Sequence, residues 1–277
     1  MPDAAVSSTG PTTARTVEIR AGDRPGAYLI RFDGRDQSYV DLGDPTRLVF
    51  DYVRWLGDLI DVHGPAGEPR RVVHVGGAGL TLPRYVAATR PRSTQTVFEP
   101  DAALTDLVRR ELPLPRASGI RVRPTDGRTG LATLRDESVD LLIVDAFAEA
   151  RVPSSLVSIE AFAEMARVLR PGGILAANLT DHAPFRHTRH TLAGLRAALP
   201  ELALLAEPAT LRGRRPGNLV ALAADAGLPL AALRTRTTRS AAPYRLLDGR
   251  AVSDSFGGGR AFADADAEPG PVDRLSG

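Results

Sequence analysis

Between Arg70 and Ala224 the sequence alternates several times between short apolar runs and amphipathic helical patterns. This feature restricts the fold most, because repeated strand–helix units build a mostly parallel sheet with helices on both faces. Strands are predicted at 72–75, 94–98, 120–122, 139–144, 174–178, 203–206 and 219–223. We therefore predict an α/β chain with a mostly parallel, seven-stranded, Rossmann-like sheet that binds ligands at the carboxyl ends of its strands.

A smaller β unit is predicted ahead of this sheet. Two short runs, 17–19 and 28–32, are separated by Gly-Asp and Asp-Gly turn signals, which is typical of antiparallel strands. The pair Asp44-Pro45 then predicts the start of a helix. We accordingly expect a disordered leader at 1–13, the β unit plus a helix at 14–62, the main domain at 63–240 and an irregular tail at 241–277.

The composition excludes several kinds of chemistry. The chain contains no cysteine and no lysine, which rules out disulfides, cysteine nucleophiles and Schiff-base lysines. The formal net charge is only +2, with one local basic cluster from Arg212 to Arg215, so we expect no nucleic-acid partner. No apolar run approaches the roughly 18–20 residues that span a bilayer, and the first residues lack the features of a signal peptide. We expect a cytoplasmic protein without a membrane partner.

The stretch from Arg71 to Arg84 predicts a strand, a tight turn and the start of a helix. A β-branched run leads into Gly76, Gly77, Ala78 and Gly79. Glycines in such a turn permit a positive φ and the close approach of a ligand, and the following helix offers unpaired N–H groups. The turn is a candidate site for a nucleotide-like ligand. The alternative is an ordinary strand-to-helix connection that happens to carry glycines.

Three acidic residues follow at the ends of the next strands. Glu99 ends the second strand, where a carboxylate can accept hydrogen bonds from a ribose diol, while Asp101 is the better helix cap. Asp126-Gly127 follows the third strand, and its acid either accepts from an adenine amino group or only forms a turn. Asp145 follows a fully apolar strand and is expected at the mouth of the cleft, where the chemistry takes place.

In their order and spacing these residues resemble the spermidine synthase-like (polyamine aminopropyltransferase-like) family of the class I adenosylmethionine-dependent methyltransferase fold. The family's motif Gly-Gly-Gly-Asp-Gly-Gly-x-x-Arg is matched by the residues from Gly76 to Arg84, and its later acids by Glu99 and Asp126. The Val-Leu-Arg-Pro-Gly-Gly segment at 168–173 is typical of the wider fold. The segment from Asp33 to Ser38 resembles the family's small β domain, which lies over the substrate cleft.

The resemblance implies a transferase that uses S-adenosylmethionine or its decarboxylated form to alkylate an amine-type acceptor, with an aminopropyl or a methyl group transferred. It implies no metal ion, and it suggests a homodimer. The implied cofactor-binding residues are Gly76, Gly77, Ala78, Gly79, Glu99, Asp126, Gly127 and Asp145. Asp145 is also the catalytic candidate, because it is the motif acid placed to remove a proton from an amine. The substrate cleft is expected to include Gln37, Phe147, Asn178 and Asp181.

Two departures from the family pattern leave other functions open. Gly79 stands where aminopropyltransferases place an acid, and Ala148 stands where a second acid normally follows Asp145. Authentic spermidine synthesis is therefore in question. The alternatives are a methyltransferase of a non-polyamine small molecule and a non-catalytic module that binds an adenosyl nucleoside. An NAD-dependent oxidoreductase is disfavoured because Leu82 replaces the last glycine of the dinucleotide motif.

Two further groups of residues have chemical potential. His182, His187 and His190 cluster late in the chain, but no acid–histidine signature surrounds them, so we expect no metal site there. Ser154-Ser155 lacks the context of a nucleophilic serine, and we expect that loop to act as a lid at most.

Overall fold

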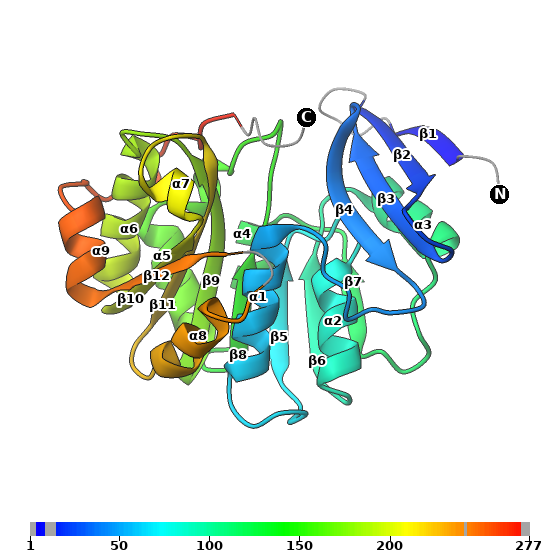
Figure 1. The fold of residues 1–277 in the computed structure, drawn as a ribbon, viewed down its shortest axis with the longest axis horizontal. Coiled ribbons are helices and arrows are strands. Elements are labelled where there is room, and N and C mark those ends of the chain that lie inside the picture. Colours follow the sequence, from blue (N-terminus) through cyan, green and yellow to red (C-terminus); the bar gives the residue numbers. More distant parts are fainter. Residues whose placement is uncertain (1–3, 9–14, 241–242, 273–277) are drawn as a thin grey trace.

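The computed structural model describes residues 4–8, 15–240 and 243–272. Within these ranges the chain forms an eight-stranded main sheet and a separate four-stranded sheet from the N-terminal part (Figure 1). The smaller sheet lies beside one end of the main sheet.

The main sheet combines a parallel half with an antiparallel half. Its strand order is β12 (Arg245–Asp248), β10 (Glu201–Ala206), β11 (Gly217–Ala224), β9 (Leu169–Asp181), β8 (Val139–Val144), β5 (Arg71–Val75), β6 (Thr94–Phe98) and β7 (Ile120–Arg123). The five neighbouring strands β9, β8, β5, β6 and β7 pair in parallel. The remaining pairs, β9 with β11, β11 with β10 and β10 with β12, are antiparallel. The predicted α/β fold is confirmed. The chain reverses direction across the sheet between β5 and β8, which makes their carboxyl ends a topological switch point.

Helices cover both faces of the main sheet (Figure 1). One hydrophobic cluster joins the strands to α4 (Gly127–Ala132), α5 (Ile159–Val168), α6 (Arg186–Ala198) and α9 (Gly249–Phe256). A second joins them to α1 (Asp51–Val62), α2 (Thr81–Thr89) and α8 (Leu230–Thr237). A third packs α3 (Ala102–Glu111) against β6 and the N-terminal sheet. Two short helices, η1 (Ser154–Leu156) and α7 (Pro208–Leu211), lie in connections.

Helix α1 packs on the main sheet, whereas the sequence predicts it as part of the N-terminal unit. Its buried residues recur at helical spacing and include Val53, Leu56 and Leu59, so its apolar stripe needs a sheet face to cover. The helix begins at Asp51, later than the pair Asp44-Pro45 predicted. The Asp44 side chain accepts instead from the backbone N–H and hydroxyl of Thr46, which closes a turn rather than capping a helix.

The N-terminal sheet is an antiparallel meander of β1 (Ala4–Ser8), β2 (Arg15–Ala21), β3 (Ala27–Phe32) and β4 (Arg35–Asp41). Strand β1 falls within the leader that we expected to be disordered. It forms because the open edge of β2 offers unpaired backbone groups to the nearest segment of chain. The other leader residues, 1–3 and 9–13, lie outside the described residues.

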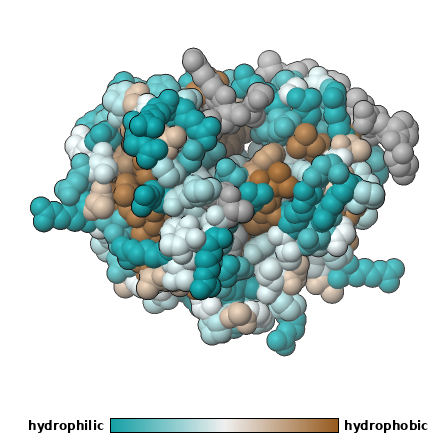
Figure 2. Space-filling view, in the orientation of Figure 1, coloured by the Kyte–Doolittle hydropathy of each residue, from teal (hydrophilic) through white to brown (hydrophobic). Residues whose placement is uncertain are grey.

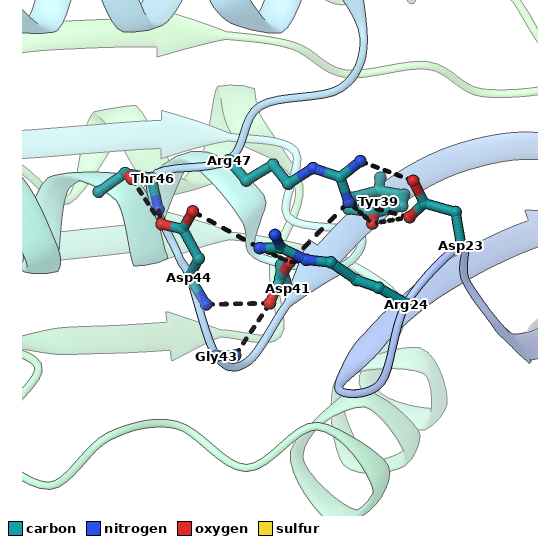
Figure 3. Close-up of polar contacts among 8 residues, drawn as sticks. All are labelled: Asp23, Arg24, Tyr39, Asp41, Gly43, Asp44, Thr46 and Arg47. Carbon is teal, nitrogen blue, oxygen red and sulfur yellow. Dashed lines mark hydrogen bonds and ion pairs between the residues drawn. The ribbon is translucent and has the colours of Figure 1, made fainter.

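A cluster of polar side chains ties the β2–β3 turn to the connection between β4 and α1 (Figure 3). Arg47 donates to both carboxylate oxygens of Asp23, at 2.6 and 2.9 Å, and its guanidinium lowers the pKa of Asp23. Asp41 accepts from Arg24 and from the backbone N–H groups of Gly43 and Asp44. These bonds fix the end of β4 and the connection that follows it against the β2–β3 turn.

The region from 243 to 272 is ordered where we expected an irregular tail. It supplies β12, which adds the eighth strand, and α9, whose Val252 and Phe256 are buried. We name residues 257–272 the C-terminal segment. This segment packs against the loop between β8 and α5, where the Ile159 N–H donates to the Phe262 carbonyl and the Gly270 N–H to the Val152 carbonyl. Residues 241–242 and 273–277 of the predicted tail lie outside the described residues.

No helix within the described ranges combines the length and the apolar character needed to cross a bilayer. On the face drawn in Figure 2, hydrophobic residues gather in two patches, one between α1 and the N-terminal sheet and one on the other side of α1, where β10 and β12 lie. Most of the rest of this face is hydrophilic or of intermediate hydropathy.

A buried histidine predicts a loss of stability in acid. His74 on β5 is 2% exposed, its Nε2 lies 3.0 Å from Gln95 Oε1, and burial lowers its pKa from 6.5 to about 4. Between these pH values the unfolded chain binds a proton that the folded chain does not, so the free energy of unfolding falls as the pH drops. The loss amounts to about 3 kcal/mol once the pH is below 4.

Urea unfolding at several pH values measures this effect. The free energy of unfolding is plotted against pH. We expect His74→Gln, which keeps a hydrogen-bond donor, to abolish the fall in this free energy that His74 causes between pH 6.5 and 4. His182→Gln, at an exposed position, serves as the matched control, and it should change the pH dependence of the free energy of unfolding by less than His74→Gln does. An unaltered slope in His74→Gln would contradict the assignment.

Candidate active site

The candidate site lies where the parallel strands of the main sheet end. The glycine turn follows β5, Glu99 follows β6, Asp126 follows β7 and Asp145 follows β8. Because β5, β6, β7 and β8 are parallel, the four segments meet at one edge of the sheet. This edge includes the switch point between β5 and β8, where open α/β sheets bind ligands.

The glycine turn is held tightly against the chain that carries Asp145. Gly76 has a φ of +95°, and a Cβ at this position would lie 2.2 Å from the Asp145 carbonyl oxygen. Its N–H donates to the Phe98 carbonyl at 2.9 Å. The turn closes with a bond from the Leu80 N–H to the Gly77 carbonyl at 2.7 Å. Only glycine fits at position 76, and the loop and the acid are therefore positioned together.

Gly79 is buried against the N-terminal sheet and does not border an open cleft. A Cβ there would lie 2.5 Å from Ile30 Cδ1 and 2.9 Å from Ser38 Cβ, and the Gly79 N–H donates to Ser38 Oγ at 3.2 Å. The Thr81 hydroxyl adds a bond to the Tyr39 carbonyl at 2.9 Å. Close packing of the N-terminal sheet thus leaves no room for the acid that aminopropyltransferases carry at this position.

Glu99 links the glycine turn to the start of α3. Its Oε2 accepts from the N–H groups of Gly77 at 3.0 Å and Ala78 at 3.3 Å, and its Oε1 accepts from the Asp101 N–H at 3.0 Å. Asp101 itself caps α3 by accepting from the Leu104 N–H at 2.8 Å. A carboxylate can accept about four hydrogen bonds, so Glu99 retains capacity for one further donor.

Asp126 is the N-cap residue of α4. Its Oδ1 accepts from the Thr129 N–H at 2.9 Å, and this hydrogen bond lowers the pKa of the carboxyl group. The side chain is exposed. Gly127 begins the helix beside β5, and a Cβ there would lie 2.2 Å from Val75 Cγ1. Glycine at this position lets α4 start close to the strand ends.

Asp145 is half-buried and lies within a chain of polar side chains. Its Oδ1 accepts from Asn178 Nδ2 at 2.8 Å, and its Oδ2 accepts from the Tyr52 hydroxyl at 3.3 Å. Asn178, on β9, accepts in turn from Asn218 Nδ2 at 3.1 Å. The predicted catalytic acid is thus oriented by residues from α1, β9 and β11.

The other predicted cleft residues have different surroundings. Asp181 is buried, and its carboxylate accepts from the His182 N–H and from the N–H and hydroxyl of Thr188 at 2.8–2.9 Å. It therefore stabilises the first turn of α6. Phe147 is half-buried against the hydrophobic cluster of α5 and α6. Gln37 is half-buried on β4, next to the serine that contacts Gly79.

Two of the three late histidines, His187 and His190, contact the C-terminal segment. His187 Nε2 lies 3.2 Å from the Glu268 carbonyl, His190 Nδ1 accepts from the Arg260 N–H at 3.0 Å, and both rings pack near Phe262. Burial lowers the pKa of His187. Among the described residues, no three histidine, aspartate or glutamate side chains come together in the manner of a metal site.

Sequence reasoning missed Tyr52 and Asn218. Tyr52 fits the apolar spacing of α1, so its hydroxyl gave no separate signal. Asn218 is a polar residue at the start of an otherwise apolar strand, and that polarity is the signal that could have identified it.

Comparisons with known proteins include a match over the full length of the chain. No protein-family model matches the chain. The crystal structure of a probable spermidine synthase from Corynebacterium glutamicum superposes on this chain with a TM-score of 0.85. The two sequences are 30% identical, and the match covers 100% of each chain. A curated polyamine aminopropyltransferase from Vibrio vulnificus is 29% identical over 143 residues, which are 50% of this chain and 46% of that protein. The chain therefore matches less than half the length of this curated relative.

A methyltransferase shares the architecture alone. Human methyltransferase-like protein 13 in complex with SAH superposes with a TM-score of 0.52 at 20% identity, over 68% of this chain and 90% of that one. This likeness supports the methyltransferase-like arrangement of the main sheet.

Proposed function

The chain belongs to the spermidine synthase-like family, and from this premise we propose that it is a transferase that moves an alkyl group from an adenosyl sulfonium cofactor to an amine. The observation that carries the proposal is the position of Asp145. This carboxylate lies at the switch point, next to the glycine turn, and two side chains hold its oxygens.

The residues at the strand ends fit an adenosyl group. Gly76 and Gly77 let the glycine turn pack closely against Asp145 and Glu99, which would bring both carboxylates and the turn around one ligand. Glu99 retains capacity for a donor such as a ribose hydroxyl. Asp126 and Gly127 lie at the end of β7, where the adenine amino group would be bound. These residues would hold S-adenosylmethionine or its decarboxylated form.

The reaction needs alignment and the removal of one proton. When bound, the sulfonium supplies an electrophilic carbon and a neutral thioether as the leaving group. Asp145 would take the proton that the amine nitrogen loses as its lone pair forms the new N–C bond, and the electrons of the S–C bond would leave with the thioether sulfur. The hydrogen bonds from Asn178 and Tyr52 fix the orientation of the Asp145 carboxylate.

The choice between aminopropyl and methyl transfer depends on positions 79 and 148, where the acids of the family pattern are absent. Position 79 has no space for a carboxylate, and position 148 carries alanine. A substrate with two positive charges loses about 1.5–3 kcal/mol for each charged hydrogen bond that is absent. This observation favours an acceptor other than a simple diamine, or a methyl donor, over spermidine synthesis.

Calorimetry tests the proposal directly. The ligands are S-adenosylmethionine, its decarboxylated form and methylthioadenosine, followed by turnover with each donor and a panel of mono- and diamines. We expect at least one nucleoside to bind and one donor to be consumed in an amine-dependent way. Failure of all three ligands to bind would overturn the proposal. Binding without turnover would leave the non-catalytic nucleoside-binding module as the function.

Substitution of Glu99 should weaken nucleoside binding. In Glu99→Gln the side chain keeps its shape but loses the charge that accepts from Gly77, Ala78 and a ribose hydroxyl. We expect the Kd for the bound nucleoside to rise about 10- to 100-fold, because hydrogen bonds to charged groups contribute about 1.5–3 kcal/mol. The measurement is calorimetry with the nucleoside that the wild-type protein binds.

The matched control for Glu99→Gln is Asp101→Asn. It removes a charge two residues away but keeps a side chain that can cap α3. An affinity that falls equally in both variants would mean that the loss reflects the local structure rather than contact with the ligand.

A further inference from the structure

Two asparagines, the buried Asn178 and the half-buried Asn218, extend the candidate site from Asp145 across β9 to β11. Asn178 is 2% exposed and lies in β9, where most neighbouring side chains are apolar. Its amide nitrogen donates to Asp145 Oδ1 at 2.8 Å, and its amide oxygen accepts from Asn218 Nδ2 at 3.1 Å. A buried amide costs free energy unless it is hydrogen-bonded, and here both ends of the amide are satisfied.

The register of the sheet places the three residues. Val144, which precedes Asp145, is opposite Ala177 in the parallel β8–β9 pair, so Asp145 and Asn178 are adjacent. Val220 is opposite Asn178 in the antiparallel β9–β11 pair. Asn218 is two residues from Val220, hence on the same face and at the diagonal position that a side chain can reach. Strands rather than loops therefore fix this chain of contacts.

The polarity of the contacts runs in one direction. A carboxylate only accepts hydrogen bonds, so Asn178 must turn its NH₂ group toward Asp145. Its carbonyl oxygen then faces β11, where it needs a donor, and Asn218 supplies one. An acceptor at position 218 would favour the reverse orientation of the Asn178 amide.

We infer that Asn178 and Asn218 are positioning residues that act through Asp145: together they hold its carboxylate in one orientation and in the charged form. This role rests on the proposed function, in which Asp145 removes the amine proton. It also revises our expectation for Asn178, since its amide is engaged between Asp145 and Asn218 rather than offered to a substrate. The titratable partner on the other side of the carboxylate is Tyr52 on α1.

The test follows the ionisation of Asp145 itself, independent of turnover. Aspartate side-chain carboxyl carbons are labelled with ¹³C and titrated by NMR, with Asp145→Asn used to assign the signal. In Asn178→Leu, the loss of a donor to the charged form should move the Asp145 titration to higher pH by about one unit. Asn218→Leu, at a half-buried position, should move it in the same direction by less.

Thr180→Val is the matched control for both variants. Thr180 is 3% exposed on the same face of β9 and lies opposite Asn218. Its hydroxyl has no hydrogen-bond partner among the described residues. This variant should titrate like the wild type. A titration that does not move in either asparagine variant, or that moves equally in Thr180→Val, would overturn the inference.

Steady-state kinetics of Asn178→Leu tests this inference separately from the proposed function. With the amine and donor that the wild-type protein accepts, Asn178→Leu should lower kcat about 10- to 100-fold, leave the KM for the donor within about threefold and shift the acidic limb of kcat/KM to higher pH. A fall in kcat with no shift of that limb would speak against positioning. If the wild type turns over no amine, the proposed function fails, while the NMR titration still decides the role of the pair.

Discussion

We expect Asp145→Asn to lower amine-dependent turnover about 100- to 10,000-fold, because general-base catalysis contributes on this scale. The substitution is nearly isosteric, and the Asn178 amide can still donate to the new carbonyl oxygen, so the site keeps its shape while losing the group that takes the proton. Binding of the adenosyl nucleoside should stay within a few-fold of the wild type. The measurements are nucleoside product formation and calorimetry on the same preparations.

The control for Asp145→Asn is Glu149→Gln, which removes an equal charge from an exposed position in the same loop. Activity near the wild-type level in this variant would show that the loss at Asp145 does not arise from net charge. Turnover by Asp145→Asn within about threefold of the wild type would exclude Asp145 as the base.

The second large effect is expected at Gly76. In Gly76→Ala the new Cβ would lie 2.2 Å from the Asp145 carbonyl oxygen and 2.8 Å from its carbonyl carbon, at a φ of +95°. Both obstacles are backbone atoms, so no rotation of a side chain relieves the contact. We expect a loss of about 2–5 kcal/mol in the free energy of unfolding, from backbone strain plus overpacking. Nucleoside binding should be lost with it.

Gly172→Ala separates the two contributions to the Gly76 effect. Gly172 also has a positive φ, +73°, but a Cβ there meets nothing within 4 Å. This variant should lose only about 1–2 kcal/mol, the cost of the conformation itself. Urea unfolding of both variants checks the difference. Equal losses at the two positions would mean that the clash with Asp145 has no effect.

The main sheet could be predicted because its signals are local. Every strand predicted between 72 and 223 lies within or overlaps an observed strand, since apolar runs bounded by turn residues mark buried strands. The candidate acids were located by the same reasoning, as the carboxyl ends of parallel strands share one edge. Asp145 in particular follows the strand β8, all of which is buried.

The missed features depend on contacts between distant parts of the chain. The β12 sequence Arg-Leu-Leu-Asp is too short and too polar to indicate a strand by itself, and it pairs only because β10 offers an open edge. The helix-stabilising role of Asp181 arises because Thr188 folds back onto it. The crowding around Gly79 comes from Ile30 and Ser38, which precede it by about forty to fifty positions. Residue patterns within a short window carry no information on such contacts.

The C-terminal segment gives the site a definite order of assembly during protein synthesis. Asp264 contacts Ser158 at the start of α5 and Arg128 in α4, residues 106 and 136 positions earlier in the chain. At about 5–20 residues per second, a ribosome needs on the order of ten seconds to cover that distance. The nascent chain therefore contains Glu99, Asp126 and Asp145 well before the C-terminal segment that contacts the loop after Asp145. During that interval the parallel strands from β5 to β8 are already synthesised, but the loop after Asp145 still lacks its contacts with the C-terminal segment.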